Sequence, residues 1–445
     1  VITRSLKKPW RLNMDAALKE ATGKKGKELY DDWRAYLEDR YEKQTAGIRD
    51  NLHTGTLVVG EDYEKAYLNV QPVFSPDGKT IAYMTNAGND YAWQVLYTMD
   101  RAGKERKRIR GGVNSAARLS PDGTKIIYSR KHKINKYGWL QNDVFVYDLE
   151  KKKEKQLTKA ARVADVDFSP DGSTIIGVKN GDGTHQIVVM DADGKNERVL
   201  VVGPKGVQFY APRYSPDGSE ILFGIFDKGA RDIAIVSSDG TGFRYVLGGK
   251  TPNDDRNACW SEDGTKVILS SDRTGIFNIY SVDVEESAVA KLTNVIGGAF
   301  MPDDSPGDGA IAYSHYSGEG YSVYLLAGDS DPVETMDVAT FVTRDAGPFD
   351  ECENLKTVSA ADTAPVLAVA GVPILCDVSA AAEVPAGNAS VTAEGSQNGA
   401  RGLWPTGVMG TGAGVGMGGY DSIAAGGSNL LGASLREGFD TGDAG

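Results

Sequence analysis

The chain has 445 residues with a formal net charge of −12, and hydrophobic residues make up 40% of it. Single hydrophobic cores rarely organise more than roughly 300 residues, so we expect one main domain with appendages. The acidic balance argues against nucleic-acid binding, and because no apolar run reaches about 18 residues the sequence predicts no transmembrane helix.

Residues 1–52 are predicted to form a short helical segment. Met14–Ala21 has the composition of a helix, with Asn13 as its N-cap. A longer helix is predicted over Lys27–Arg49, because large apolar residues recur there at every fourth position and share one face. These residues are Leu29, Trp33, Leu37 and Tyr41.

A short motif then recurs along the chain. Its first copy is Phe74-Ser75-Pro76-Asp77-Gly78, and the sixth copy, Asp304–Gly309, is degraded and holds one extra residue. The Asp of each Asp-Gly pair stands at 77, 122, 171, 217, 263 and 308, so the copies are 45 to 49 residues apart. A period in the forties with β patterning is typical of a four-stranded propeller blade.

Each repeat predicts the same local structure. Pro presets φ, Asp bonds its own backbone and Gly accepts a positive φ, so Ser-Pro-Asp-Gly predicts a tight turn between two strands. A β-rich run such as Ile81-Ala82-Tyr83 follows at once, and runs such as Gln94–Tyr97 and Val199-Leu200-Val201 supply a third and an outer strand. We therefore predict an all-β fold, with a six-bladed β-propeller over residues 53–330.

A ring of blades has to close, because an open ring exposes sheet edges. No clear outer strand follows Tyr321–Leu326, whereas Gly55–Gly60 precedes the first repeat in the way that Arg198–Gly203 precedes the fourth. We infer that Leu57–Val59 supplies the outer strand of the last blade and joins the two ends of the ring. An open or a seven-bladed array is the alternative.

Residues 331–445 depart from this pattern. Gly and Ala dominate, Lys and Arg nearly vanish, and strand periodicity fades. We predict a low-complexity tail that is largely disordered or poorly packed. A reading-frame error near codons 325–340 is a second explanation.

The repeats resemble the propeller of the TolB family. An aromatic residue before Ser-Pro-Asp-Gly and the run Ser271–Tyr280 are similar to the blade pattern of that family, over about residues 55–330. The resemblance implies a non-catalytic module of a bacterial envelope protein that binds a protein or peptide, in the periplasm or cell envelope. The chain begins with Val1 and no signal peptide follows it, so we expect a processed precursor or a piece of a longer chain. The oligomeric state stays open.

The segment Ala17–Tyr41 resembles the end of a zinc-peptidase domain of the peptidase-MA type. This implies an alternative function, an accessory propeller of a zinc metallopeptidase whose catalytic domain lies upstream of Val1. The zinc motif of that family, His-Glu-x-x-His, is absent from this sequence, whose four histidines stand apart at 53, 132, 185 and 315. A helical arm packed on the propeller is the other interpretation.

No set of residues in the sequence predicts catalysis. Gly-x-Ser-x-Gly, the motif of a serine hydrolase, does not occur. Gly414–Gly419 fits Gly-x-Gly-x-x-Gly but lacks the flanking strand and helix of a dinucleotide fold. The repeat aspartates, about 45 residues apart around a ring, do not converge as calcium ligands must. We predict no cofactor and no metal site, and a propeller lyase or glycosidase has no support in the sequence.

Binding residues are predicted in the loops that enter the innermost strands at the mouth of the central channel, because such loops carry recognition. Tyr and Arg are also favoured as interface anchors. The candidates are Asn69, Gln71, Asn114, Asp165, Tyr210, Arg256 and Asn257. For each of them, a solvated loop residue is the alternative.

Overall fold

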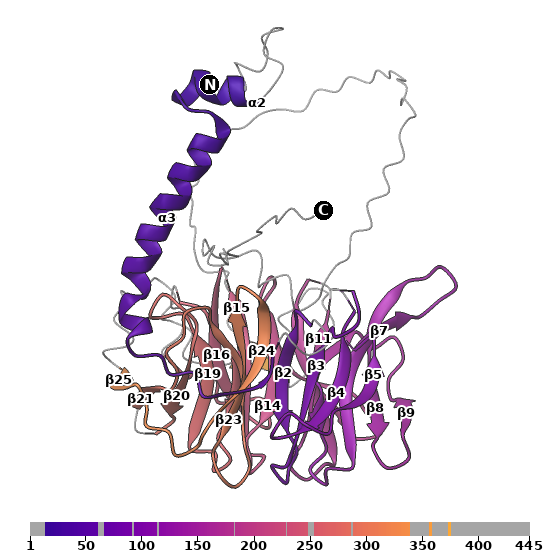
Figure 1. Ribbon diagram of the computed structural model, residues 1–445. Helices are drawn as coiled ribbons and strands as arrows, with labels where there is room; N and C mark the ends of the chain where they lie inside the picture. Colours follow the sequence, from indigo (N-terminus) through magenta and orange to yellow (C-terminus); the bar gives the residue numbers. More distant parts are fainter. Residues whose placement is uncertain are drawn as a thin grey trace, which may run out of the picture.

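The computed structural model describes residues 14–60, 66–90, 93–113, 115–181, 183–227, 229–247, 253–285 and 288–338, together with two short strands at 356–357 and 373–374. In these residues, two helices precede six β-sheets that stand around a central axis as blades (Figure 1). The predicted six-bladed propeller with a helical N-terminal segment is confirmed. Asn13 and, apart from the two short strands, the predicted tail beyond residue 338 lie outside the described residues.

The N-terminal helices are α2, Met14–Thr22, and α3, Gly26–Arg49. Exposed ion pairs one helical turn apart, such as Lys27 with Asp31, support α3. On its predicted apolar face, Trp33 is 49% exposed, and Figure 1 shows most of α3 extending away from the blades. The helix is therefore not packed along the propeller. Within the described chain, neither helix has the length and apolar content needed to cross a bilayer.

Each blade is an antiparallel sheet whose strands follow one another outward from the axis. Blade 1 holds β2 (Asn69–Phe74), β3 (Thr80–Thr85), β4 (Val95–Asp100) and β5 (Lys107–Gly111). Blade 2 holds β6 (Arg118–Leu119), β7 (Lys125–Lys133), β8 (Leu140–Asp148) and β9 (Lys153–Gln156). Blade 3 holds β10 (Val163–Phe168), β11 (Thr174–Asn180), β12 (His185–Asp191) and β13 (Arg198–Val202).

The other three blades complete the ring. Blade 4 holds β14 (Gln208–Tyr214), β15 (Glu220–Asp227), β16 (Ala230–Ser237) and β17 (Arg244–Tyr245). Blade 5 holds β18 (Asp255–Trp260), β19 (Lys266–Ser271), β20 (Asn278–Asp283) and β21 (Ala288–Lys291). Blade 6 holds β22 (Ala299–Asp304), β23 (Ile311–Ser317), β24 (Gly320–Leu326) and, from the other end of the chain, β1 (Thr56–Val59).

Ser-Pro-Asp-Gly forms the turn between the first two strands of a blade, as predicted. Ser75 Oγ donates to Asp77 Oδ1 over 2.6 Å and accepts from the backbone N–H of Thr80 over 2.9 Å, while Gly78 adopts a φ of 67°. The same bonds recur in the next four blades, through Ser120, Ser169, Ser215 and Ser261. These aspartates are therefore turn residues.

The ring closes through its N-terminal strand. β1 pairs antiparallel with β24, with Leu57 opposite Tyr324 and Val59 opposite Val323. Val59 is buried in the apolar cluster between blades 6 and 1. The inference that Leu57–Val59 completes the last blade is confirmed, and the alternatives of an open or a seven-bladed array are wrong.

Further strands are added at the outer edges of two blades. β25, Glu334–Asp337, pairs antiparallel with β21 on blade 5, so the described β structure passes the boundary predicted at residue 330. A four-residue strand gives too short a pattern to be read from the sequence. β26 (Lys356–Thr357) pairs with β27 (Pro373–Ile374), which pairs parallel with β13 on blade 3.

Candidate binding site at the channel mouth

The innermost strands share a bulge. In β2, β10, β14, β18 and β22, two residues stand opposite one on the neighbouring strand. The first of the two has a φ between 44° and 55°, which residues other than glycine rarely adopt. These residues are Gln71, Asp165, Ala211, Asn257 and Met301. The repeated bulge redirects the side chains around it.

Six of the seven predicted binding residues lie at this bulge or just before it. Gln71, Asp165 and Asn257 occupy the bulge. The residues before it are Asn69, Tyr210 and Arg256. All six lie inside strands, so their prediction as loop residues is wrong. The bulge interrupts the alternation of side chains, so the first half of each strand does not show the period of two that identifies a strand in a sequence. Asn114 lies outside the described residues.

Asn69 and Gln71 lie at the junction of blades 1 and 6. Asn69 is fully buried, and its Nδ2 donates to the backbone oxygen of Tyr321 over 3.2 Å. The backbone N–H of Gln71 donates to Ser314 Oγ over 3.1 Å. Burial and these bonds support a role for Asn69 in holding the first and last blades together.

Tyr210, Arg256 and Asn257 come together in a cavity of about 70 Å³. Tyr210 comes from the innermost strand of blade 4, and the other two come from that of blade 5. Further lining residues are Arg231 of β16 and Phe300 and Met301 of β22. The cavity is therefore built by three neighbouring blades.

Two arginines share one carboxylate beside this cavity. Arg256 donates to both oxygens of Asp254, with Nε 3.0 Å from Oδ1, whereas Nη1 of Arg231 lies 4.0 Å from Oδ1. The Arg231 guanidinium donates no hydrogen bond to any described residue, and its carbon stands 5.4 Å from the centre of the Tyr210 ring. Burial lowers the pKa of Arg231, and the charge of Arg256 lowers it further. Arg231 is a desolvated cation with unused donors.

The neighbouring charges compensate one another. Arg273 pairs with Asp255, and their side chains are only 4% and 1% exposed. Asp272 Oδ1 accepts the backbone N–H of Asp254 over 2.8 Å. Partial burial raises the pKa of Asp272, which favours its neutral form. Among the described charged groups at the cavity, Arg231 is thus the one without a hydrogen-bonded counter-ion.

Asp165 lies in the channel wall of blade 3, close to Tyr210. Burial raises the pKa of Asp165, and the backbone N–H of Ala211 opposes that shift. Burial also raises the pKa of Tyr210, and the nearby charge of Asp165 adds to the increase. Both groups therefore favour their neutral forms more than they would in water.

A ring of six residues, four of them charged, crosses the channel below the bulge, and none of its members is among the predicted residues. Each innermost strand contributes the residue at one register position: Val73, Arg118, Asp167, Arg213, Cys259 and Asp303. Oδ1 of Asp303 lies 3.6 Å from Nη1 of Arg118 and 3.4 Å from Nη1 of Arg213. Because these three residues come from blades 6, 2 and 4, their side chains meet across the axis and form a floor beneath the mouth.

The signal for this ring was present in the sequence. Arg118, Asp167 and Arg213 each stand four residues before the Asp of their turn, so the same place in three repeats holds a charged residue. Burial raises the pKa of Asp167 to about 7 and that of Asp303 to about 6, and Arg118 opposes both shifts.

This architecture defines a six-bladed β-propeller with a small cavity at its channel mouth. Residues 63–209 match the family model described as the TolB beta propeller domain. The resemblance seen in the Ser-Pro-Asp-Gly repeats is confirmed, and the chain contains a TolB-like β-propeller. The resemblance of residues 17–41 to a peptidase-MA-type domain stays a prediction.

Solved structures with a similar fold include TolB from Acinetobacter baumannii, which is 18% identical over 62% of this chain and 66% of its own, with a TM-score of 0.45. A putative TolB from Agrobacterium tumefaciens is 20% identical over 59% of this chain and 90% of its own, with a TM-score of 0.43. A puromycin-hydrolysing peptidase from Mycobacterium tuberculosis is 18% identical over 64% of this chain and 49% of its own, with a TM-score of 0.42. The chain spans just under two thirds of the first of these proteins. At such values the likeness carries no weight for function.

Proposed function

We propose that this propeller is a non-catalytic module of a bacterial envelope protein that binds a peptide segment of a partner at its channel mouth. The observation that carries the proposal is Arg231, which lines the cavity with a side chain that is 13% exposed and donates no hydrogen bond to any residue that the structure describes. An anionic group that enters meets this cation with little competing water, which strengthens charge-assisted hydrogen bonds.

The size of the cavity supports a peptide group as its occupant. Pockets for small-molecule ligands usually measure about 300–1,000 Å³, whereas this one measures about 70 Å³. Since a water molecule occupies about 30 Å³, the space suits one carboxylate and its nearest carbons. We infer that an Asp or Glu side chain, or a chain terminus, enters the cavity while the rest of the peptide lies across the mouth.

The side chains around the cavity support binding rather than covalent catalysis. Arg256 donates its hydrogen bonds to Asp254, so Arg256 positions the wall of the cavity. Arg231 is the group that contacts the ligand. Cys259 lies in the ring below, and burial raises the pKa of its thiol, which keeps it protonated and a poor nucleophile.

Selection of a random peptide library on the purified protein, followed by titration of the selected peptides, tests this proposal. We expect the peptides to share a carboxylate that amidation inactivates. Arg231→Gln should weaken their binding by roughly tenfold to a hundredfold, because one charge-assisted hydrogen-bonding partner is lost. Arg198→Gln, a change at an exposed arginine of outer strand β13, is the matched control. Equal affinity of wild type and Arg231→Gln would remove the proposed site.

The TolB resemblance also supports a location in the periplasm or cell envelope. Fractionation of the producing cells tests this location separately from binding. Recovery of the mature protein in the cytoplasmic fraction alone would contradict it.

A further inference from the structure

The hairpin of β7 and β8 reaches beyond the ring. Its ladder runs from Lys125 opposite Asp148 to Lys133 opposite Leu140. In blade 5, the matching ladder ends where Ser271 stands opposite Asn278. Figure 1 shows the β7 hairpin standing out past the neighbouring blades.

Asp143 in blade 2 corresponds to Asn278 in blade 5, because both accept the same hydrogen bonds. Thr158 Oγ1 donates to Asp143 Oδ1 over 2.8 Å, and Thr293 Oγ1 donates to Asn278 Oδ1 over 3.0 Å. Beyond this shared point, the blade 2 hairpin has twelve residues, 131–142, against six in blade 5, 272–277. The blade 2 hairpin is thus an extension of the common plan.

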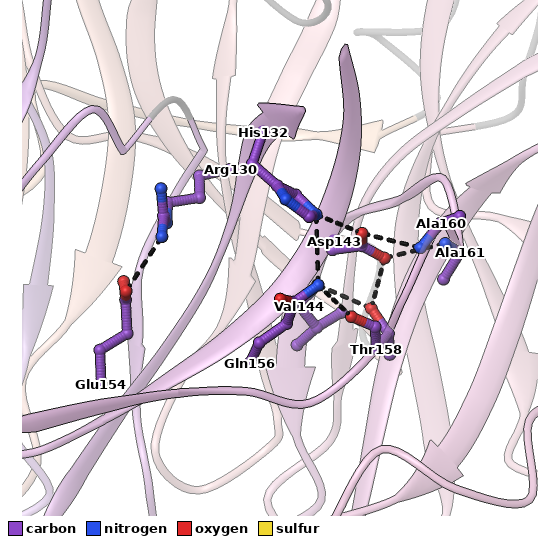
Figure 2. Close-up of polar contacts among 9 residues, drawn as sticks. All are labelled: Arg130, His132, Asp143, Val144, Glu154, Gln156, Thr158, Ala160 and Ala161. Atoms are coloured by element: carbon purple, nitrogen blue, oxygen red, sulfur yellow. Dashed lines mark hydrogen bonds and ion pairs between the residues drawn. The ribbon is translucent and has the colours of Figure 1, made fainter. Parts of the chain in front are cut away.

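The base of the hairpin is held firmly (Figure 2). Asp143 is fully buried and accepts the backbone N–H groups of Ala160 and Ala161, each over 2.8 Å. His132 Nε2 lies 2.6 Å from Asp143 Oδ2, and Arg130 donates to Glu154 Oε2 over 3.0 Å. The hairpin is therefore a preorganised projection.

Its tip exposes large apolar side chains. Tyr137, Trp139 and Leu140 are 75%, 65% and 58% exposed. Asn135 Oδ1 accepts the backbone N–H groups of Tyr137 and Trp139, over 3.0 and 3.3 Å, and the backbone N–H of Ile134 donates to the oxygen of Trp139 over 2.9 Å. These three N–H groups of the tip backbone are thus paired, which lowers the cost of moving the tip into an apolar phase.

The charge of the hairpin contrasts with that of the chain. No Asp or Glu occurs over residues 130–142, which include Arg130, Lys131, Lys133 and Lys136, although the whole chain carries a net charge of −12. Lys133 and Lys136 are exposed, and Lys136 Nζ stands 5.2 Å from the centre of the Tyr137 ring. Trp and Tyr favour the bilayer interface, and lysines beside them favour anionic headgroups.

We propose that this hairpin binds the surface of a bilayer containing anionic lipid. Tyr137, Trp139 and Leu140 enter the interface, and Lys133 and Lys136 contact the headgroup phosphates. A lipid surface suits the hairpin better than a protein does, because a stable protein interface usually needs about 800 Å² from each partner, and a two-stranded tip offers no broad face or groove.

The hairpin also lies on the face where the cavity opens. In blades 4 and 5 the innermost strand starts beside the end of the second strand, as Gln208 beside Phe226 and Asp255 beside Ser271 show, and blade 2 has the same strand order. The tip of the β7 hairpin, at the end of a second strand, therefore shares the face of the channel mouth. Docking through the hairpin brings the mouth close to the membrane.

Cosedimentation of the full chain with vesicles tests the proposal. One set of vesicles is made of equal parts phosphatidylglycerol and phosphatidylcholine, and the other of phosphatidylcholine alone. We expect binding to the anionic set that falls steeply with salt. Trp139→Ser combined with Leu140→Ser should lower the partition coefficient about tenfold or more, and so should Lys133→Gln combined with Lys136→Gln.

Matched controls separate the hairpin from general surface effects. Trp33→Ser removes an aromatic side chain that is 49% exposed on α3. Lys79→Gln combined with Lys195→Gln removes two lysines, 82% and 76% exposed, from turns on the opposite face. These controls and Arg231→Gln should bind vesicles like wild type.

Two results would overturn the proposal. One is equal sedimentation of wild type and both hairpin variants. The other is that the wild type binds neither vesicle set but is retained on polyglutamate, which would make the hairpin a docking element for an acidic protein. Because the changed side chains are exposed, the variants should fold, and thermal unfolding checks this.

Discussion

Replacing Asp167 by asparagine is predicted to stabilise the propeller, by an amount that grows with pH. Burial raises the pKa of Asp167 from 3.8 to about 7, against the opposing charge of Arg118. Among the described residues it accepts one hydrogen bond, from the backbone N–H of Phe168 over 2.9 Å. A carboxyl group with so few partners is more stable protonated, and asparagine is a neutral side chain of nearly the same shape.

The sign of the effect follows from proton uptake. Because the folded-state pKa of Asp167 is raised, the folded chain binds a proton that the unfolded chain releases. The stability that this proton contributes is complete below about pH 4 and is lost as the pH rises to about 7. Asparagine needs no proton, so the variant does not lose this stability.

The magnitude follows from the part of that pH window that lies above the lower assay value, about pH 5. From about pH 5 to about pH 7, two pH units correspond to about 2.7 kcal/mol. Asp167 remains partly accessible inside the channel, so solvent screening reduces the effect and we take about half, ~1.4 kcal/mol. The free energy of unfolding of Asp167→Asn, relative to that of wild type, should therefore be ~1.4 kcal/mol higher at about pH 8 than at about pH 5.

Urea unfolding of wild type and variant at these two pH values measures the difference. Asp171→Asn is the matched control in the same blade. The Ser169 hydroxyl and the backbone N–H of Ser173 lower the pKa of Asp171 to about 2, so its contribution is lost only below about pH 4. The control should destabilise the chain equally at both pH values. A gain for Asp167→Asn that did not change with pH, or a loss at the higher pH, would refute the reasoning.

Two further predictions concern ring closure, both measured by urea unfolding. Val59→Ala should lower the free energy of unfolding by about 1–3 kcal/mol, because Val59 is buried at 1% exposure where β1 completes blade 6. Leu57→Ala, at a side chain that is 52% exposed, should change the free energy of unfolding by less than about 0.5 kcal/mol. Equal changes for the Val59 and Leu57 variants would show that β1 contributes little to closure. Gly55→Ala should destabilise the chain strongly, because φ is +70° and a Cβ would stand 2.2 Å from the backbone oxygen of Leu325. Gly23→Ala, with φ +83° and no atom of the described residues within 4 Å of the new Cβ, should cost only about 1 kcal/mol. A Gly55→Ala variant as stable as this control would contradict the predicted clash.

The predicted binding residues show where a pattern in the sequence stops being informative. Residue type and a place before an innermost strand predict Tyr210 and Arg256 as binding residues, and both line the cavity. The sequence does not predict Arg231, because this residue stands at the start of the third strand of its blade, 21 residues from Tyr210. No periodicity in the chain connects those two positions.

The local chemistry of the turns and the spacing of the repeats were determined by the sequence alone. The hydrogen bonds of the Ser-Pro-Asp-Gly turn lie within six residues, so the structure of the turn does not depend on distant parts of the chain. Closure by Leu57–Val59 could also be inferred, because that segment precedes the first repeat at the position where an outer strand precedes the fourth. Such features depend on contacts between neighbours in the sequence or on the repeat itself.

Only the tertiary structure decided what faces the channel. The bulge in the innermost strands shifts the side-chain alternation, and the ring places Arg118, Arg213 and Asp303 within ion-pair distance although they are far apart in the sequence. The cavity likewise takes its walls from three blades. Charged side chains become buried and form ion pairs only when the blades pack around one axis. A short stretch of sequence therefore cannot predict which charges will pair.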